Sequence, residues 1–283
     1  MLFFDRRISL TIARPAPTSF FKTLPNAVVV EDLRVQFRIE KQLGKDPNTC
    51  EVIVSNLAQN TRAELQTKPL NITLEAGYDT QVARLFRGDL QWSESKRVGP
   101  DFESKLLIGD GDRAYRYARV NRTFKAGTSH LTILAEAADS MNVSIPNNVK
   151  ADPGMQGQTA TGVTLRGYSR NVISRIAKIV NREWSIQDGV LQMNLRNETN
   201  VGEAFVVSED TGMIGTPEFG SPPKKKEQPV LKVRSLLRPE INAGTLISVE
   251  AANINGNFKV RRVTHSGDTH GVAWYSEMEA VPL

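Results

Sequence analysis

The sequence predicts a mainly β protein in which an α+β insert separates two antiparallel β units. Apolar and polar residues alternate through most of the first and last thirds of the chain, as in half-buried strands. In the middle third, apolar residues recur at helical spacing in two segments. The predicted domains are a first β unit at 1–112, an α+β unit at 113–202 and a second β unit at 203–283 with a loop at 215–229.

The composition is that of a globular chain. Its 283 residues exceed one typical domain of about 100–200 residues, and 40% hydrophobic with 24% charged residues is enough to bury a core. Cys50 is the only cysteine, which excludes an intrachain disulfide and a thiolate-rich zinc site. No apolar run approaches the roughly 20 residues that span a bilayer, so we expect no membrane span.

The amino-terminal segment predicts a first strand. Arg6 and Arg7 precede an apolar stretch at 8–13, an order also found in twin-arginine export signals. That stretch is shorter than the minimum of about seven apolar residues in an export signal, and Arg14 interrupts it. We therefore expect synthesis and assembly in the cytoplasm.

In the first β unit, 33–40 (LRVQFRIE) alternates apolar and polar residues without exception. Four further alternating segments follow, separated by turn clusters such as GKDPN at 44–48 and KRVGPD at 96–101. Five or six short antiparallel strands with regular turns indicate a small barrel or a sandwich. Asn60 is a plausible N-cap for one short helix between them.

The middle unit combines helices with a hairpin. Thr128 is the expected N-cap of an amphipathic helix at 129–141, and Ser169 is the expected cap of a second helix. Asp188 and Gly189 lie between two alternating runs and predict a tight hairpin.

The second β unit is predicted to close with a hairpin of strands 258–265 and 272–280 around a turn at 266–269, with Trp274 in the core of that unit. Asn255-Gly256 is a turn signal between two earlier strands.

The same hairpin raises a metal hypothesis. His265, Asp268 and His270 lie within six positions, and imidazole and carboxylate are zinc ligands. The remaining histidine, His130, belongs to the middle unit, so the hairpin lacks a further histidine to complete a set of three or four convergent ligands. The composition SGDTHG favours a polar hairpin loop, with the metal site as a minor alternative.

No catalytic or cofactor-binding motif is evident. Cys50 lies in a predicted strand, GxSxG and Walker A motifs are absent, and Glu209-Asp210 is expected to be a solvated turn. The net charge of +5 is dispersed, and Lys224, Lys225 and Lys226 beside two prolines indicate an exposed loop more than a phosphate site. We therefore expect no enzyme activity and no cofactor.

Three stretches resemble the baseplate hub proteins of tailed bacteriophages, the late control protein D-like family. They are 54–127, the segments between 211 and 251, and 256–280. The ending is the most specific part: a strand rising to VTHSGD, a turn, and a strand that carries Trp274 and Glu279. The resemblance covers roughly 52–280.

This resemblance implies a structural protein of the virion, built from two tail-tube-like β-barrel modules with a small α+β domain between them. It implies a homotrimer that presents a pseudo-sixfold ring to the hexameric tail tube and a threefold face to the trimeric spike. The implied partners are a tail tube or distal tail protein, the spike, the tape measure protein and other baseplate proteins, with DNA only in transit through the channel. Because the chain ends directly after the second module, we expect the spike to be a separate protein.

The predicted interface residues are basic: Lys224, Lys225, Lys226, Arg234, Arg261 and Arg262. Two alternatives stay open. One is a tail-tip cell-wall hydrolase or metal-dependent enzyme that uses His265, Asp268 and His270, and the other is a carbohydrate- or DNA-binding β module.

Overall fold

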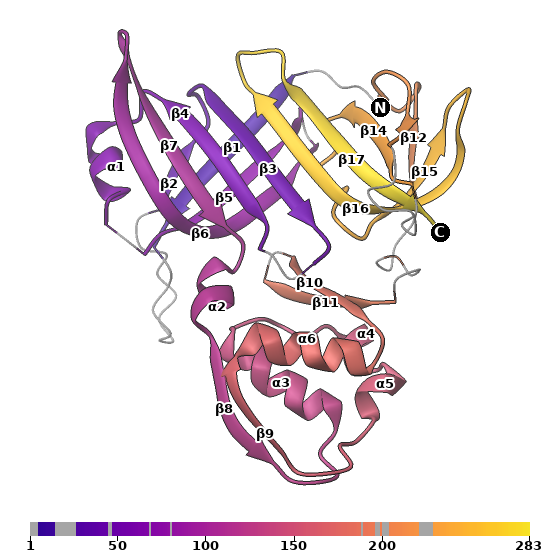
Figure 1. Cartoon of the computed structure of the whole chain (residues 1–283). Helices are drawn as coiled ribbons and strands as arrows, with labels where there is room; N and C mark the ends of the chain where they lie inside the picture. Colours follow the sequence, from indigo (N-terminus) through magenta and orange to yellow (C-terminus); the bar gives the residue numbers. More distant parts are fainter. Residues whose placement is uncertain are drawn as a thin grey trace. The chain divides into compact units, whose positions relative to one another are not determined.

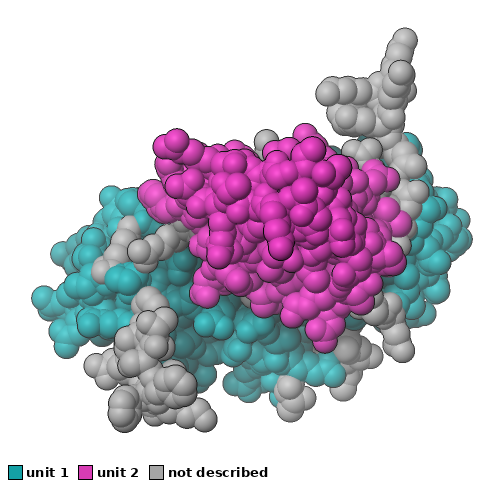
Figure 2. All heavy atoms as spheres, turned by 90° about the horizontal axis from the view of Figure 1, so that it is seen from below, with its two compact units in different colours: residues 1–42, 49–109, 200–283 teal, residues 43–48, 110–199 magenta. Residues whose placement is uncertain are grey.

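The computed structural model describes 5–14, 27–44, 47–67, 69–79, 81–187, 189–195, 199, 204–220 and 229–283. The chain divides into two compact units, coloured separately in Figure 2. Unit 1 contains 1–42, 49–109 and 200–283, and unit 2 contains 43–48 and 110–199. Among the described residues, no helix combines the length and apolar character needed to cross a bilayer.

Unit 1 is built from strands. Its elements are β1 (Arg6–Ala13), β2 (Val28–Val30), β3 (Val35–Gln42), β4 (Thr49–Ser55), α1 (Gln59–Glu64), β5 (Asn71–Tyr78), β6 (Gln81–Val98), β7 (Asp101–Gly109), β12 (Phe205–Ser208), β13 (Glu218–Phe219), β14 (Leu231–Leu236), β15 (Leu246–Glu250), β16 (Asn255–Asp268) and β17 (Trp274–Pro282). The prediction of a mainly β fold is confirmed. The expected short helix is α1, although it begins after Ala58 and not after Asn60.

All strands of unit 1 belong to one thirteen-stranded sheet, whose central part is visible in Figure 1. Its main order is β13-β14-β17-β16-β3-β4-β7-β6-β5-β1-β2, and β15 links β12 to β16. The pairing of β16 with β3 connects the carboxy-terminal strands to the amino-terminal strands. Seven residue pairs form this seam, from Arg262 opposite Gln42 to Asp268 opposite Gln36.

Two apolar cores lie within unit 1. The first is formed mainly by strands β1 to β7 and includes Val35, Phe37 and Ile39 of β3. The second is formed by the carboxy-terminal strands and includes Val263 of β16 and Met278 of β17. Since successive residues of a strand point to opposite faces, the alternation in the sequence placed these side chains in the cores correctly.

The last hairpin is longer than predicted. Strand β16 continues to Asp268 and β17 begins at Trp274, so the reversal occupies 269–273 and not 266–269. Trp274 is buried as expected, but it belongs to the first core. The reason is the β3–β16 seam, which brings the Trp274 ring to 5.6 Å from the Phe37 ring in an edge-to-face contact.

A second turn prediction was also wrong. Asn255 and Gly256 lie inside β16, paired with Glu250 and Val249, and the chain reverses at 251–254. The amide of Ala251 donates to the carbonyl oxygen of Ile254 at 3.0 Å and closes this wider loop. The Asn255-Gly256 dipeptide therefore lies directly after the turn between β15 and β16 and not within it.

Unit 2 is a small α+β unit. Its elements are α2 (Asp112–Tyr117), β8 (Arg119–Phe124), α3 (His130–Ser140), α4 (Asn147–Lys150), α5 (Pro153–Gln156), β9 (Val163–Tyr168), α6 (Ser169–Ile179), β10 (Glu183–Gln187) and β11 (Val190–Asn194). Strands β8 and β9 pair antiparallel, and β10 and β11 form the predicted hairpin. Asp188 lies outside the described residues, while Gly189 has the positive φ of 78° that such a turn requires.

The two main helices begin differently from the prediction. Ser129, not Thr128, is the N-cap of α3, because its side chain accepts a hydrogen bond from the amide of Thr132. The Thr128 hydroxyl instead donates to the carbonyl oxygen of Lys125. Ser169 is the first residue of α6, and its hydroxyl lies 2.6 Å from that of Ser140 in a contact that joins α3 and α6.

We expect Gly267→Ala to destabilise unit 1 by about 1–3 kcal/mol, the usual cost of an overpacked core. A Cβ at Gly267 would lie 2.3 Å from Phe37 Cε1 and 2.9 Å from Trp274 Cε3. Chemical denaturation of the purified chain measures the change. Gly220→Ala is the matched control, because its Cβ would be in ordinary contact with Val230 O at 3.5 Å and Lys232 Cε at 3.7 Å, and we expect a change within about 0.5 kcal/mol. Equal losses in both variants would contradict this account of the seam.

Candidate functional site

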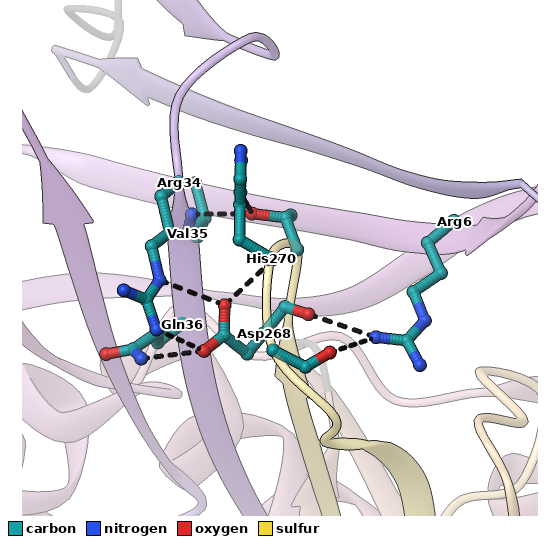
Figure 3. Close-up of polar contacts among 8 residues, drawn as sticks. Arg6, Arg34, Val35, Gln36, Asp268 and His270 are labelled. Carbon is teal, nitrogen blue, oxygen red and sulfur yellow. Dashed lines mark hydrogen bonds and ion pairs between the residues drawn. The ribbon is translucent and has the colours of Figure 1, made fainter.

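The seam between β3 and β16 ends in a polar cluster centred on Asp268, shown in Figure 3. Arg34 donates two hydrogen bonds to its carboxylate, Nε to Oδ1 at 3.2 Å and Nη2 to Oδ2 at 2.7 Å. Gln36 donates to Oδ2 at 2.8 Å and the backbone amide of His270 donates to Oδ1 at 2.9 Å. The hydrogen bond from Arg34 is the main reason that the pKa of Asp268 lies well below its usual range.

Arg6 binds the hairpin from the other side in Figure 3. Its Nη1 donates to the carbonyl oxygens of Gly271 at 2.6 Å and Asp268 at 3.2 Å. Its guanidinium carbon also lies 5.4 Å from the centre of the Trp274 ring. Two arginines from the amino-terminal part of the chain therefore hold the tip of the carboxy-terminal hairpin.

Beyond the cluster, one face of the sheet of unit 1 carries alternating charges across neighbouring strands. We call it the charged face. One row runs across five strands through Gln42, Arg262, Glu279, Lys232 and Glu218, each opposite the next. The row beside it contains Glu40, Thr264, Glu277 and Arg234.

Contacts within these rows are typical of an exposed surface. Arg262 Nη2 donates to Gln42 Oε1 at 3.0 Å, and its Nη1 lies 4.0 Å from Glu279 Oε2. Arg234 lies 3.6 Å from Glu277 and 3.6 Å from the centre of the Tyr275 ring. Exposed ion pairs contribute only about 0–1 kcal/mol each, so these charges are available to a partner at little cost.

A groove of about 420 Å³ crosses the charged face. Its lining comes from β3, β13, β14, β16, β17 and the segment before β13: Arg38, Glu40, Ile214, Thr216, Glu218, Lys232, Val233, Arg234, Arg262, Thr264, Glu277, Met278 and Glu279. The charged face continues on the other side of β3, where Lys105 of β7 pairs with Glu51 of β4 at 2.7 Å. Basic and acidic side chains are interspersed, so no single sign dominates.

A model of the baseplate hub gp41 family matches 19–280, which is most of the chain. The chain belongs to this family. The recognition of a baseplate hub from the sequence is thus confirmed, and hub proteins of this kind belong to the tail baseplate of the virion. A search of curated proteins found no match.

Solved structures support the fold of this hub-family chain. The 43 kDa tail protein of prophage MuSo2 from Shewanella oneidensis is 10% identical, with a TM-score of 0.66 over 98% of this chain and 97% of that one. The tail protein of Neisseria meningitidis MC58 is 9% identical, with a TM-score of 0.63 over 98% and 97%. The Escherichia coli c3393 protein is 9% identical, with a TM-score of 0.55 over 89% and 74%. At these identities the likeness concerns the fold alone.

The structure brings together two of the six predicted interface residues. Arg234 and Arg262 line the same groove. Arg261 is exposed beside it, at the irregularity where β16 shifts register against β17. Lys224, Lys225 and Lys226 lie outside the described residues. The acidic partners Glu277 and Glu279 were missed, although their alternation with buried residues in β17 could have revealed them.

The proposed metal ligands do not share a site. His265 is fully buried, with Nδ1 2.8 Å from the Ser276 hydroxyl, and burial lowers its pKa to about 3. The His270 side chain contacts the Thr269 hydroxyl, while the Asp268 carboxylate is engaged by Arg34 and Gln36. Within the described ranges, no three His, Cys, Asp or Glu residues lie close enough to hold a metal ion.

Cys50 is buried in β4, as expected, and burial raises the pKa of its thiol, so the nucleophilic thiolate is disfavoured. Glu209 and Asp210 lie in an exposed turn. Neither position provides a nucleophile with a neighbouring base.

We expect Asp268→Asn to lose about 2 kcal/mol of stability at pH 7, because charge-assisted hydrogen bonds to Arg34 are weakened. Since the folded pKa of Asp268 is lowered, the full contribution is present above the unfolded pKa of about 3.9 and is lost gradually as the pH falls from there through the lower folded pKa. Denaturation curves should therefore show a larger difference in stability between wild type and variant at pH 7 than at pH 3. Asp210→Asn, in an exposed turn, is the control, and a pH-independent loss for Asp268→Asn would contradict the ionic role.

Proposed function

We propose that the chain is a trimeric hub that joins the hexameric tail tube to the trimeric spike and acts as a scaffold without catalysis. In this proposal, 1–112 and 203–283 are two tube-like modules and 113–202 is the α+β domain between them. Assembly takes place in the cytoplasm of the host bacterium. The tail tube or distal tail protein, the spike, the tape measure protein and other baseplate proteins are the proposed partners.

The observation that carries this proposal is the single sheet with two cores. Residues of β3 and β16, more than 200 positions apart in sequence, are hydrogen-bonded neighbours, so each chain holds two β modules in one fixed arrangement. Three such chains offer six modules around a threefold axis. A ring of this composition can match a hexamer through its six modules and a trimer through its three chains.

Similar proteins support the partner assignment. The c3393 protein is described as a component of the type VI secretion system with structural similarity to the T4 tail proteins gp27 and gp5. A second relative in fold is the PdpA-VgrG complex of Francisella, 8% identical with a TM-score of 0.64 over 98% of this chain and 58% of that one. We therefore propose that the chain, too, is a component of a tail-like assembly.

We further propose that the charged face lines the channel through which the tape measure protein and DNA pass. A lining rich in lysine and arginine alone would bind the phosphate backbone and retain DNA. On the charged face, each arginine that lines the groove has a side-chain nitrogen within 4.0 Å of a glutamate oxygen. DNA would therefore meet a surface of little net attraction and could move along it.

The trimer is tested by the mass of the purified chain in solution. We expect a species of three times the chain mass of 31.4 kDa at micromolar concentration, measured by sedimentation equilibrium. A chain that remains monomeric, both alone and mixed with the tube and spike proteins of the same phage, would contradict the proposal.

The channel assignment is tested with a charge reversal. Phages whose hub carries Glu277→Lys and Glu279→Lys should assemble but release DNA more slowly at low salt, because the face becomes net positive, and added salt should restore the rate. Glu209→Lys with Asp210→Lys is the control with the same change of charge at an exposed turn. Equal release rates in both variants would place the charged face away from the DNA path.

A further inference from the structure

Most of the net charge of the chain lies in unit 2. Residues 110–199 contain twelve basic and eight acidic residues, so they account for +4 of the total of +5. Several of these charges are neutralised inside the unit: Arg182 pairs with Asp152 at 2.7 Å, and Arg122 pairs with Glu136. The basic surface of unit 2 is therefore expected where arginines lie without such an acidic partner.

The β8–β9 ribbon presents these arginines on one face. Its inner face carries Val120, Phe124 and Leu165, which pack in the core of the unit with residues of α3 and α6. Figure 1 shows both helices beside the ribbon. Residues of the other face alternate with these, and we call this side the ribbon face: Arg119 opposite Tyr168, Asn121 opposite Arg166, and Thr123 opposite Thr164.

Tyr168 organises two arginines at one end of the ribbon face. The guanidinium carbon of Arg119 lies 4.7 Å from the centre of the Tyr168 ring, and that of Arg170 lies 4.9 Å from it. Arg119 Nη2 also donates to the Tyr168 hydroxyl at 3.3 Å. Stacking on a ring limits the rotamers of an arginine. Less side-chain conformational entropy is therefore lost when the N–H donors of its guanidinium group bind a carboxylate or phosphate.

The ribbon face carries no acidic residue to neutralise this charge. In the described part of unit 2, Arg119, Arg166 and Arg170 make no ion pair with a carboxylate. Two guanidinium groups thus share one ring without a carboxylate beside them among the described residues of unit 2. The two positive guanidinium groups repel each other, and a bound anionic group would offset that repulsion.

We propose that the ribbon face is a docking surface for an acidic protein segment. The complementary ligand is a run of carboxylates on another protein of the assembly, bound by the arginine forks. The proposal depends neither on the trimer nor on the charged face.

The composition of the ribbon face favours a protein over a nucleic acid. Arginine and tyrosine are enriched in protein interfaces, whereas lysine is depleted there. The ribbon face has Arg119, Arg166 and Tyr168 and no lysine, and Arg170 of α6 lies against Tyr168. Bases of single-stranded nucleic acids stack on free aromatic rings. The Tyr168 ring is already occupied by two guanidinium groups.

The test uses the full chain and three fluorescent probes: an acidic peptide of alternating Glu and Ser, the same peptide with Gln for Glu, and an oligothymidylate of equal charge. We expect the wild type to bind the acidic peptide in preference to the other two in fluorescence anisotropy at low salt. The variant R119Q/R166Q/R170Q should weaken this binding about tenfold, the sum of three exposed ion pairs.

The matched control is K150Q/R175Q/K178Q, which removes three exposed charges from helices of the same unit. We expect it to change the dissociation constant less than about twofold. The single variant R166Q leaves the contacts of Arg119 and Arg170 with Tyr168 intact and should produce part of the loss of binding. It therefore tests the proposal even if the triple variant fails to fold. Equal weakening by both triple variants, tighter binding of the oligothymidylate, or no binding of the acidic peptide would overturn the proposal.

Discussion

The architecture of unit 1 depends on the pairing of β3 with β16. Each strand also pairs with a strand from its own end of the chain, β4 for β3 and β17 for β16, so this one seam makes a single sheet from two sets of strands. The first core is formed mainly by β1 to β7, with Trp274 added from β17, and the second core is formed by the carboxy-terminal strands. Without the seam, both sets would expose a strand edge, and exposed edges promote aggregation.

Two different kinds of interaction stabilise one end of the seam. At one end, Asp268 joins Arg34 and Gln36, and at the same end Trp274 packs edge-to-face on Phe37. Gly267 lies between these two contacts, where a side chain has no room. The polar cluster fixes the register, because a shift by one residue would move Asp268 to the apolar face.

Period-two alternation predicted most strands of unit 1 and helical spacing predicted α3 and α6, because both patterns are local. The seam could not be predicted in this way, since alternation identifies the buried face of a strand and not its neighbour. The same limit explains the interpretation of His265 and Asp268. They are neighbours in sequence but point to opposite faces of β16, so one is buried beside Ser276 and the other binds Arg34.

The seam also has a consequence for the order of events during synthesis. A ribosome makes β3 long before β16 and Trp274, so the first core lacks one of its largest side chains until β17 has emerged. Contacts between residues so far apart close slowly, because a long loop must be ordered first. A truncated or unfinished chain would leave Phe37 without its aromatic partner and one edge of β3 open. The sheet of unit 1 is thus complete only after β16 and β17 have been made, and a partly synthesised subunit differs from a finished one at the open edge of β3.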